Sequence, residues 1–215
     1  MIIGVCGFIG AGKDTVADYL VNVHEFRRES FANTLKDAVA SVFGWDRTLL
    51  EGRTKEGREW REQVDTWWAE RLGIHYLTPR WVLQYWGTDV LRKCFHDDIW
   101  VASLENKLRK TRDDIVISDC RFPNEITAIK NAGGLVIRVV RGQEPAWMDA
   151  AIAHMKGPGT IGWALGKTLL DSFNVHASEY SWVATNFDHI LENNSSMDSL
   201  YEKISKIVDE MRVVA

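Results

Sequence analysis

The sequence predicts an α/β fold in which a parallel sheet of about five strands is covered by helices on both faces. Two observations lead to this prediction. Short apolar runs alternate with segments whose apolar residues recur at helical spacing, and a glycine-rich turn follows the first apolar run. The 215 residues, 46% of them hydrophobic, are enough for one sizeable core, so we expect one domain with an insertion.

The predicted elements follow in the order strand, helix, strand, helices, strand, helix, strand, loop, strand, helix. The predicted strands are residues 1–6, 26–31, 115–117, 135–140 and 190–191. The predicted helices are residues 15–23, 33–44, 123–131 and 196–213, and the tryptophan-rich stretch 45–112 is expected to be mostly helical. This alternation is typical of parallel strands joined by helical crossovers.

Residues 157–167 differ from the rest because they contain four glycines and one proline. This composition predicts a mobile connection between the last two strands. A plain surface loop and an active-site lid are equally good interpretations of it.

Composition excludes several classes of protein. Charged residues make up 26% of the chain and the net charge is −4, which disfavours a partner such as duplex DNA or RNA. The three cysteines, Cys6, Cys94 and Cys120, form no metal pair or disulfide framework. The first residues lack a basic leader, and no apolar run approaches the ~18 residues of a membrane span. We therefore expect a cytoplasmic protein with no membrane partner.

A phosphate-binding motif follows the first predicted strand. Residues 7–13, GFIGAGK, match G-x-x-x-x-G-K between a strand and a helix. Glycines let backbone amides approach phosphate oxygens, the helix N-terminus adds a positive dipole end, and Lys13 can reach the β- and γ-phosphates. The residues Gly10, Ala11, Gly12, Lys13, Asp14 and Thr15 are therefore candidates for binding a nucleotide. The motif predicts a three-layer P-loop NTPase fold.

The motif departs from its usual form after the lysine. Asp14 occupies the place of the serine or threonine that normally binds Mg²⁺, and a hydroxyl comes one position later, at Thr15. Asp14 could hold the metal directly or through water. Alternatively, Asp14 caps the helix and Thr15 contacts the α-phosphate. The sequence leaves both alternatives open.

A second group of charged residues follows later strands. Asp119 comes at the end of the predicted strand 115–117, where a carboxylate can organise Mg²⁺ on the β- and γ-phosphates. Arg121 follows two residues later, and Arg141 ends the strand 135–140. Arginine forks bind phosphate and offset repulsion between anions. We expect Asp119 to bind metal, Arg121 to act catalytically and on the acceptor, and Arg141 to bind nucleotide.

Several segments together resemble one family. They are GFIGAGKDTVADYL (7–20), SFANTLKDAVASVFGWD (30–46), LTPRWVLQYWGTDVLR (77–92), ISDCRFPNEI (117–126) and HASEYSW (176–182). In that order they resemble the deoxynucleoside monophosphate kinase family of tailed bacteriophages, over nearly the whole chain. The segments containing GKDT and DCRFPNE are the most specific. A distant similarity to phosphomevalonate kinase rests on a GKD loop and a D-x-R pattern.

The resemblance implies a nucleoside-monophosphate-kinase-like fold and Mg²⁺-dependent transfer of phosphate from ATP to a deoxynucleoside monophosphate. It implies a single domain, 1–215, with a core (1–32, 113–145 and 185–215), a helical acceptor-binding insertion (about 33–112) and a lid-like region (about 146–184). If the chain is phage-encoded, the compartment is the host cytoplasm. An acceptor phosphate is largely a dianion at neutral pH, so it needs positioning more than a general base.

The resemblance also implies residues of the acceptor site. Lys36 would face the acceptor phosphate. Gln84, Thr88 and Arg92 would line the pocket, and their spacing of four puts them on one face of a helix. Trp60 or Trp86 is expected to stack on the base, because an indole face suits a nucleobase, although most tryptophans are expected in the core. The segment with His176, Ser178 and Glu179 has no assigned role.

Other functions remain open at this point. The chain could phosphorylate another small acceptor, such as phosphomevalonate or dephospho-coenzyme A. It could instead be a nucleotide-binding regulator, a DNA-associated NTPase or a structural phage protein, although the last leaves GKDT unexplained. The sequence does not specify the accepted bases, the rejection of ribose or the oligomeric state, and a homodimer is suggested only by the general frequency of dimers.

Overall fold

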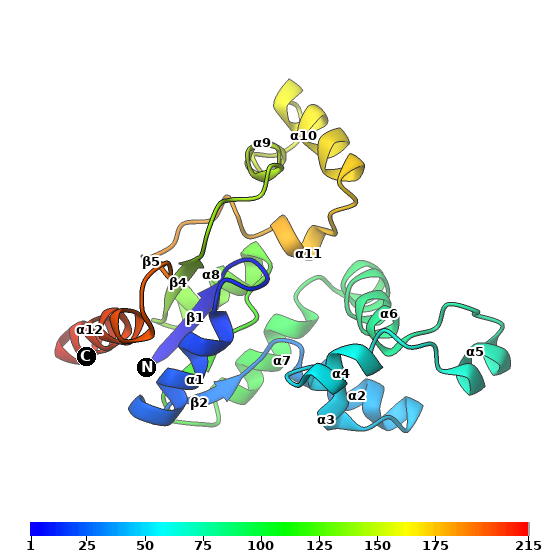
Figure 1. Ribbon diagram of the computed structural model, residues 1–215, viewed down its shortest axis with the longest axis horizontal. Coiled ribbons are helices and arrows are strands. Elements are labelled where there is room, and N and C mark those ends of the chain that lie inside the picture. Colours follow the sequence, from blue (N-terminus) through cyan, green and yellow to red (C-terminus); the bar gives the residue numbers. More distant parts are fainter. Residues whose placement is uncertain (215) are drawn as a thin grey trace. The chain divides into compact units, whose positions relative to one another are not determined.

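The computed structural model describes residues 1–214, and it divides into two compact units, Met1–Ser30 with Thr111–Ala215, and Phe31–Lys110 (Figure 1). The first unit contains β1 (Ile2–Cys6), α1 (Lys13–His24), β2 (Arg27–Glu29), β3 (Ile115–Ile117), α8 (Pro123–Asn131), β4 (Leu135–Val140), α9 (Met148–Met155), α10 (Ile161–Ser172), α11 (Ala177–Tyr180), β5 (His189–Glu192) and α12 (Met197–Val214). The second contains α2 (Asn33–Phe43), α3 (Arg47–Glu51), α4 (Lys55–Trp60), α5 (Thr66–Leu72), α6 (Pro79–Gln84), the π-helix η1 (Tyr85–Phe95) and α7 (Ile99–Leu108).

The first unit is built on one parallel sheet. Its five strands lie in the order β2-β3-β1-β4-β5, and every neighbouring pair is parallel. In β1, Gly4 lies beside Ile117 of β3 and Val136 of β4. All carboxyl ends therefore meet at one edge of the sheet, which is where ligands bind in open α/β folds. The predicted three-layer P-loop fold is confirmed.

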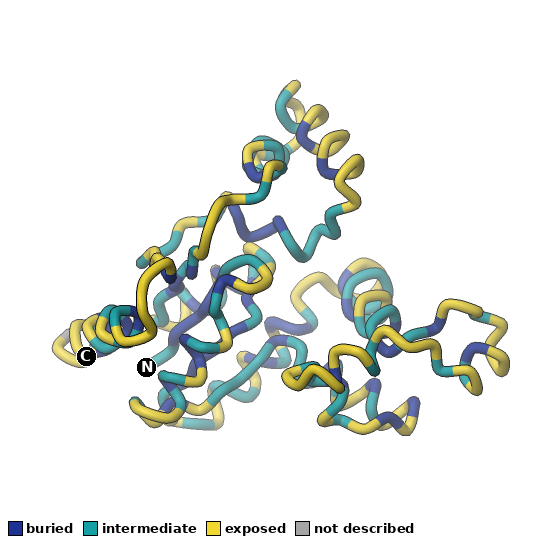
Figure 2. Tube along the Cα trace, viewed as in Figure 1, coloured by how far each residue is buried: buried dark blue, intermediate teal, exposed yellow. Residues whose placement is uncertain are grey.

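Alternation along β1 explains the layers. Ile3 and Val5 face one side of the sheet and belong to the same buried cluster as Leu20 of α1 and Ile204 of α12. Gly4 faces the other side, where a Cβ atom would lie 2.7 Å from the Ile129 Cδ1 atom of α8. The inner strands β1 and β3 are buried on both faces, and β1 is dark in Figure 2, whereas the edge strands β2 and β5 keep exposed residues.

The expectation of a loop in the glycine-rich stretch 157–167 is wrong for most of its length. Only residues up to Thr160 form a turn, with Gly157 and Gly159 at positive φ, and α10 begins at Ile161 (Figure 1). The Thr160 hydroxyl accepts a hydrogen bond from the Trp163 amide at 3.0 Å and caps this helix.

The close packing of α9 against α10 explains why residue 166, in the stretch predicted to be mobile, is a glycine. A Cβ atom on Gly166 would lie 2.5 Å from the Ala150 carbonyl oxygen and 3.0 Å from the His154 nitrogen. Gly166 is buried, so its missing side chain lets two backbones approach each other. Gly166 therefore reflects the packing of the helical hairpin formed by α9 and α10, not a mobile loop. The lid-like role of the region stays a prediction.

The second unit is helical, as the sequence predicts, and aromatic side chains form much of its core. Phe43 stacks on Trp45 with ring centroids 4.4 Å apart and contacts Trp68 and Trp86 at 4.9 and 5.4 Å. The Trp45 indole nitrogen donates to the Asp65 carboxylate at 2.7 Å, which satisfies its polar group. Most of these tryptophans are structural.

Within the part of the chain that the structure describes, no helix combines the length and the apolar character that crossing a bilayer requires.

We predict that Gly166→Ala destabilises the hairpin by about 1–3 kcal/mol, because the new methyl group collides with backbone atoms that cannot rotate away. Gly162→Ala is the matched control, since its Cβ atom would lie 3.7 Å from the Ala153 Cβ atom. That control should be neutral or stabilising by up to about 1 kcal/mol. Thermal unfolding and amide hydrogen exchange of residues 148–172 measure the difference, and equal effects of the two substitutions would contradict the packing argument.

Candidate phosphate-binding site

The turn after β1 depends on three glycines at positive φ, and two of them, Gly7 and Gly12, also lack room for a side chain. Gly7, Gly10 and Gly12 have φ angles of 147°, 81° and 104°. A Cβ atom on Gly7 would lie 2.5 Å from the Val139 carbonyl oxygen, and one on Gly12 would lie 2.4 Å from the Asn193 amide nitrogen. The glycines therefore permit both the left-handed backbone and the close approach of neighbouring strands.

The helix that follows has an open N-terminus. Gly12 occupies the N-cap position of α1, and among residues 1–214 no side chain caps this helix. The amides of the first turn, at Lys13, Asp14 and Thr15, cannot be satisfied within the helix. Because these donors add to the positive end of the helix dipole, the turn can bind an anion such as a polyphosphate.

Lys13 points back onto the turn. Its ammonium group donates to the Phe8 carbonyl oxygen at 2.9 Å. Burial lowers the pKa of Lys13, and the nearby Arg121 guanidinium lowers it further, while Asp14 and Glu179 act in the opposite direction. Two cations therefore lie close enough to repel each other, and a phosphate between them would relieve that repulsion.

An aromatic clamp holds the same turn. The Phe8 ring lies between Trp147, with centroids 5.3 Å apart, and Trp182, at 4.8 Å. The Arg138 guanidinium lies over the Trp182 ring, 5.5 Å from its centroid. Trp147 directly precedes α9 and Trp182 follows α11, so both ends of the hairpin region pack against the turn.

Asn193 is a site residue that sequence reasoning missed. It follows β5, is buried, and donates from its side-chain amide to the Ala11 carbonyl oxygen at 2.9 Å. Its backbone nitrogen donates to the Val140 carbonyl at 2.8 Å. Asn193 therefore fixes the turn to the sheet. The only signal in the sequence is a polar residue directly after the last strand.

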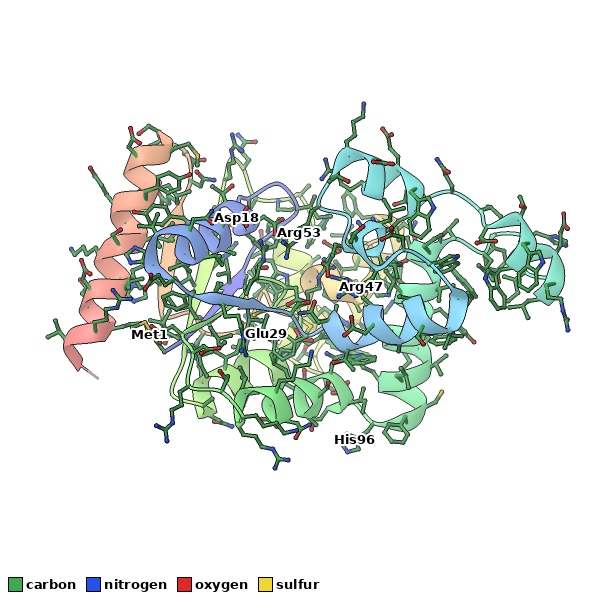
Figure 3. All side chains as sticks on the ribbon, turned by 90° about the horizontal axis from the view of Figure 1, so that it is seen from below. Met1, Asp18, Glu29, Arg47, Arg53 and His96 are labelled. Carbon is green, nitrogen blue, oxygen red and sulfur yellow. The ribbon has the colours of Figure 1, made fainter. Side chains whose placement is uncertain are left out.

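Asp14 and Asp119 have protein partners. Asp14 forms an ion pair with Arg28 of β2, which also binds Asp18 at 2.7 Å and the Ser118 hydroxyl at 2.8 Å (Asp18 is labelled in Figure 3). Asp119 follows β3 at the predicted sheet edge and accepts a hydrogen bond from the Ser30 hydroxyl. Thr15 lies half-buried in the first turn of α1.

Arg121 is held by two carboxylates. Its backbone nitrogen donates to the buried Glu125 carboxylate at 2.7 Å, and its guanidinium donates to Glu179 of α11 at 2.9 Å. Glu125 also accepts from the Phe122 nitrogen at 3.1 Å, which completes the N-terminal cap of α8. Neither Glu125 nor the link between Glu179 and Arg121 was predicted from the sequence.

The remaining predicted residue of this unit is Arg141, which is exposed just beyond β4. The register places Arg138 beside Cys6, so β4 extends past the end of β1 toward the edge where the turn begins. The turn, Asp119, Arg121, Arg141 and Asn193 thus all belong to the carboxyl ends of strands.

Predicted acceptor residues of the second unit are partly engaged in ion pairs. The Lys36 ammonium donates to Glu51 at 2.8 Å, and Arg47 bonds both Glu51 and Asp37 (Arg47 is labelled in Figure 3). Hydrogen bonds from these two cations outweigh burial and lower the pKa of Glu51 to about 2. Glu51 was not singled out from the sequence, and it neutralises the lysine assigned to the acceptor phosphate.

The other acceptor candidates differ in exposure. Gln84 ends α6 and is exposed, Thr88 is half-buried, and Arg92 is 5% exposed with its guanidinium donating to the Asp97 carbonyl at 3.1 Å. Thr88 and Arg92 lie on η1, a π-helix, in which residues four apart still project to roughly the same side, so their shared face stays a prediction. π-helices occur often at functional sites.

The two tryptophan candidates pack within the same unit. Trp60 contacts Trp45 edge-on at 5.9 Å, and Trp86 contacts Phe43. Both are half-buried, so part of each side chain remains exposed. Stacking on a base stays a prediction for both.

The residues fit a metal carried by phosphate. Within residues 1–214 no three His, Cys, Asp or Glu side chains gather closely enough to form a metal site of their own. Mg²⁺ bound with nucleotide needs only one or two carboxylates besides phosphate and water oxygens. Asp119 at the sheet edge, beside the anion-binding turn, meets that requirement.

Comparisons with known proteins agree on one family. A family model described as deoxynucleotide monophosphate kinase matches residues 62–155. A protein of Acanthamoeba polyphaga mimivirus, whose description as a deoxynucleotide monophosphate kinase is itself provisional, is 30% identical over 224 residues, covering 97% of this chain and 96% of the relative. The deoxynucleoside-5′-monophosphate kinase of Escherichia phage T5 is 27% identical over 174 residues, covering 58% of this chain and 70% of the relative.

Solved structures are similar only at a low level. Shikimate kinase from Aquifex aeolicus covers 100% of both chains with a TM-score of 0.43 and 10% identity. Dephospho-CoA kinase from Campylobacter jejuni reaches a TM-score of 0.43 at 15% identity, covering 97% of this chain and 96% of its own. Neither likeness supports a functional argument.

We predict that ATP binding is coupled to proton uptake by Lys13. The pKa of Lys13 is lowered from its ordinary 10.5, mainly by burial, and a bound phosphate should raise it again. Affinity should therefore fall as pH rises through the lowered pKa, with up to about one proton taken up on binding in that range. Calorimetry in buffers of different ionisation enthalpy measures this uptake.

Lys13→Arg is the matched variant for this measurement. It keeps the positive charge but does not titrate below about pH 12. The uptake should disappear in this variant, and equal uptake in both proteins would show that another group titrates.

Proposed function

Because the chain belongs to the deoxynucleotide monophosphate kinase family, we propose that it transfers the γ-phosphoryl group of ATP to the 5′-phosphate of a deoxynucleoside monophosphate, giving the diphosphate and ADP. The observation that carries this proposal is the glycine turn that opens into the uncapped α1 with Lys13 at its start. The family makes the chain a phosphotransferase with ATP as co-substrate. The two curated relatives do not favour phosphomevalonate or dephospho-coenzyme A as acceptors.

The donor site follows from the turn. Residues 10–15 would bind the ATP phosphates with their amides, and Lys13 would move from the Phe8 carbonyl to the β- and γ-phosphates. Arg121 would stabilise the transferring group, and Arg141 would contact the nucleotide from the end of β4. The repulsion between Lys13 and Arg121 supports these roles, because an anion between them removes it.

Magnesium is the proposed metal. When bound, it would neutralise charge on the β- and γ-phosphates. Asp119, Thr15 and Asp14 are the candidate ligands. The ion pair between Asp14 and Arg28 favours Asp119 and Thr15, because Asp14 would have to give up a charged partner.

The acceptor site is proposed for the second unit. Lys36 would hold the acceptor phosphate, and Gln84, Thr88 and Arg92 would contribute to the pocket wall. Arg121, which belongs to the first unit, is a further candidate for binding the acceptor. Trp60 or Trp86 would stack on the base. Lys36 would have to share its charge between Glu51 and that phosphate, which calls for a strongly anionic acceptor. A monophosphate dianion has that charge at neutral pH, so no general base is needed.

Several broader predictions accompany the proposed activity. We expect small nucleotides as ligands, without a nucleic-acid or membrane partner. The two relatives come from viruses, so a virus-encoded enzyme acting in the host cytoplasm is the proposed setting. A homodimer remains a prediction.

A panel of acceptors tests the proposal. Protein, ATP and Mg²⁺ are incubated with each deoxynucleoside and ribonucleoside monophosphate, and with phosphomevalonate and dephospho-coenzyme A. ADP formation should depend on at least one deoxynucleoside monophosphate. ATP hydrolysis that no acceptor stimulates would instead support a nucleotide-binding regulator.

Substitution of Lys13 is the second test of the proposed activity. Lys13→Met should reduce kcat by at least about 100-fold, because it removes charge from the transferring phosphate. Lys206→Met, on the exposed face of α12, is the matched control and should keep full activity. Circular dichroism should show that both variants fold. Retained turnover in Lys13→Met would contradict the assigned role.

A further inference from the structure

Glu179 connects α11 to Arg121 across 58 residues of sequence. The distance from the Arg121 Nη1 atom to the Glu179 Oε1 atom is 2.9 Å. The Arg121 side chain is 45% exposed and that of Glu179 is 26% exposed. A partly exposed arginine has many accessible rotamers, so a fixed partner at its guanidinium restricts where the charge can lie.

The other end of Arg121 is also fixed. Its backbone nitrogen is bound by Glu125, a carboxylate that is 3% exposed and that also caps α8. One carboxylate therefore holds the main chain and a second, from a different element, orients the head group. Among residues 1–214, only Nη1 of the guanidinium has a protein partner, so Nη2 and Nε remain available to a phosphate.

The element that carries Glu179 is braced. His176 caps α11 by accepting from the Ser178 nitrogen at 3.2 Å, and the Ser181 hydroxyl donates to the Ala177 carbonyl at 2.7 Å. Trp182, 2% exposed, packs on Phe8 of the phosphate-binding turn. The carboxylate thus comes from backbone that is anchored to the turn itself and is not a free surface group.

We propose that Glu179 is a positioning residue that orients the Arg121 guanidinium toward the transferring phosphate, so that the α11 segment forms part of the phosphate site. This inference rests on the proposed kinase function and on the role given there to Arg121. Glu179 has two opposing effects on a phosphate bound here. It fixes the position of the Arg121 guanidinium, which favours binding, and its own negative charge repels the phosphate. We favour the orienting effect because Glu179 leaves Nη2 and Nε of Arg121 available and because α11 is anchored to the turn.

The opposite role makes a different prediction. If Glu179 only occupied Arg121 until an anion displaced it, removing its charge would tighten ATP binding and leave kcat unchanged or higher. A positioning role predicts lower kcat with little change in KM for ATP. The two roles are therefore separated by the direction of the change.

A double-mutant cycle with Arg121 tests the proposal. In the full-length protein, Glu179→Gln should lower kcat about tenfold and change KM for ATP by less than about twofold. In the Arg121→Ala background, the same substitution should change kcat by less than about twofold, because the group that it positions is gone. Glu179→Asp keeps the charge and should retain more activity than Glu179→Gln.

Controls separate this inference from its premise. Glu210→Gln, on the exposed face of α12, removes one negative charge away from the site and should leave kcat unchanged. If Glu179→Gln does not fold, the double-mutant cycle with Arg121→Ala is measured with Glu179→Asp instead. A tenfold loss in both Arg121 backgrounds would overturn the positioning role while leaving the kinase function intact, as would tighter ATP binding. An unchanged kcat in Arg121→Ala alone would overturn the role of Arg121 and the inference with it.

Discussion

The constraint on which the rest of the structure depends is the left-handed glycine turn between β1 and α1. It leaves the first amides of α1 without partners and directs them toward the carboxyl edge of the sheet. The turn has little freedom to change, because Val139 and Asn193 fill the space that side chains on Gly7 and Gly12 would occupy. An anion-binding surface made of backbone is therefore built into the fold, and its chemistry depends on the charged groups around it.

Those groups include two cations, Lys13 and Arg121, and the carboxylates that lie near them. Burial lowers the pKa of Lys13, and the Arg121 guanidinium nearby lowers it further. The structure compensates with main-chain and carboxylate partners: the Phe8 carbonyl for Lys13, and Glu179 for Arg121. A nucleotide phosphate can replace the first of these contacts, which links binding of the donor to reorganisation of the site.

Sequence reasoning succeeded where chemistry is local. The strands, the turn, and the position of Asp119 after β3 all follow from short patterns whose physical cause lies within a few residues. It failed where the cause lies elsewhere in the fold. The glycines of 157–167 suggested a loop because the backbone of α9, which explains Gly166, is not visible in that segment. Asn193 and Glu179 likewise gain their roles from residues 182 and 58 positions away. The π-helical form of η1 has no pattern in the sequence that distinguishes it from an α-helix.

Amide hydrogen exchange in the turn and the first turn of α1 tests the central claim most directly. The amides of Lys13, Asp14 and Thr15 should exchange at least about tenfold more slowly when ATP and Mg²⁺ are added, because phosphate oxygens then accept hydrogen bonds from them. Exchange that stays unchanged at these residues, at an ATP concentration that supports turnover, would contradict the account, because the nucleotide would then be bound elsewhere.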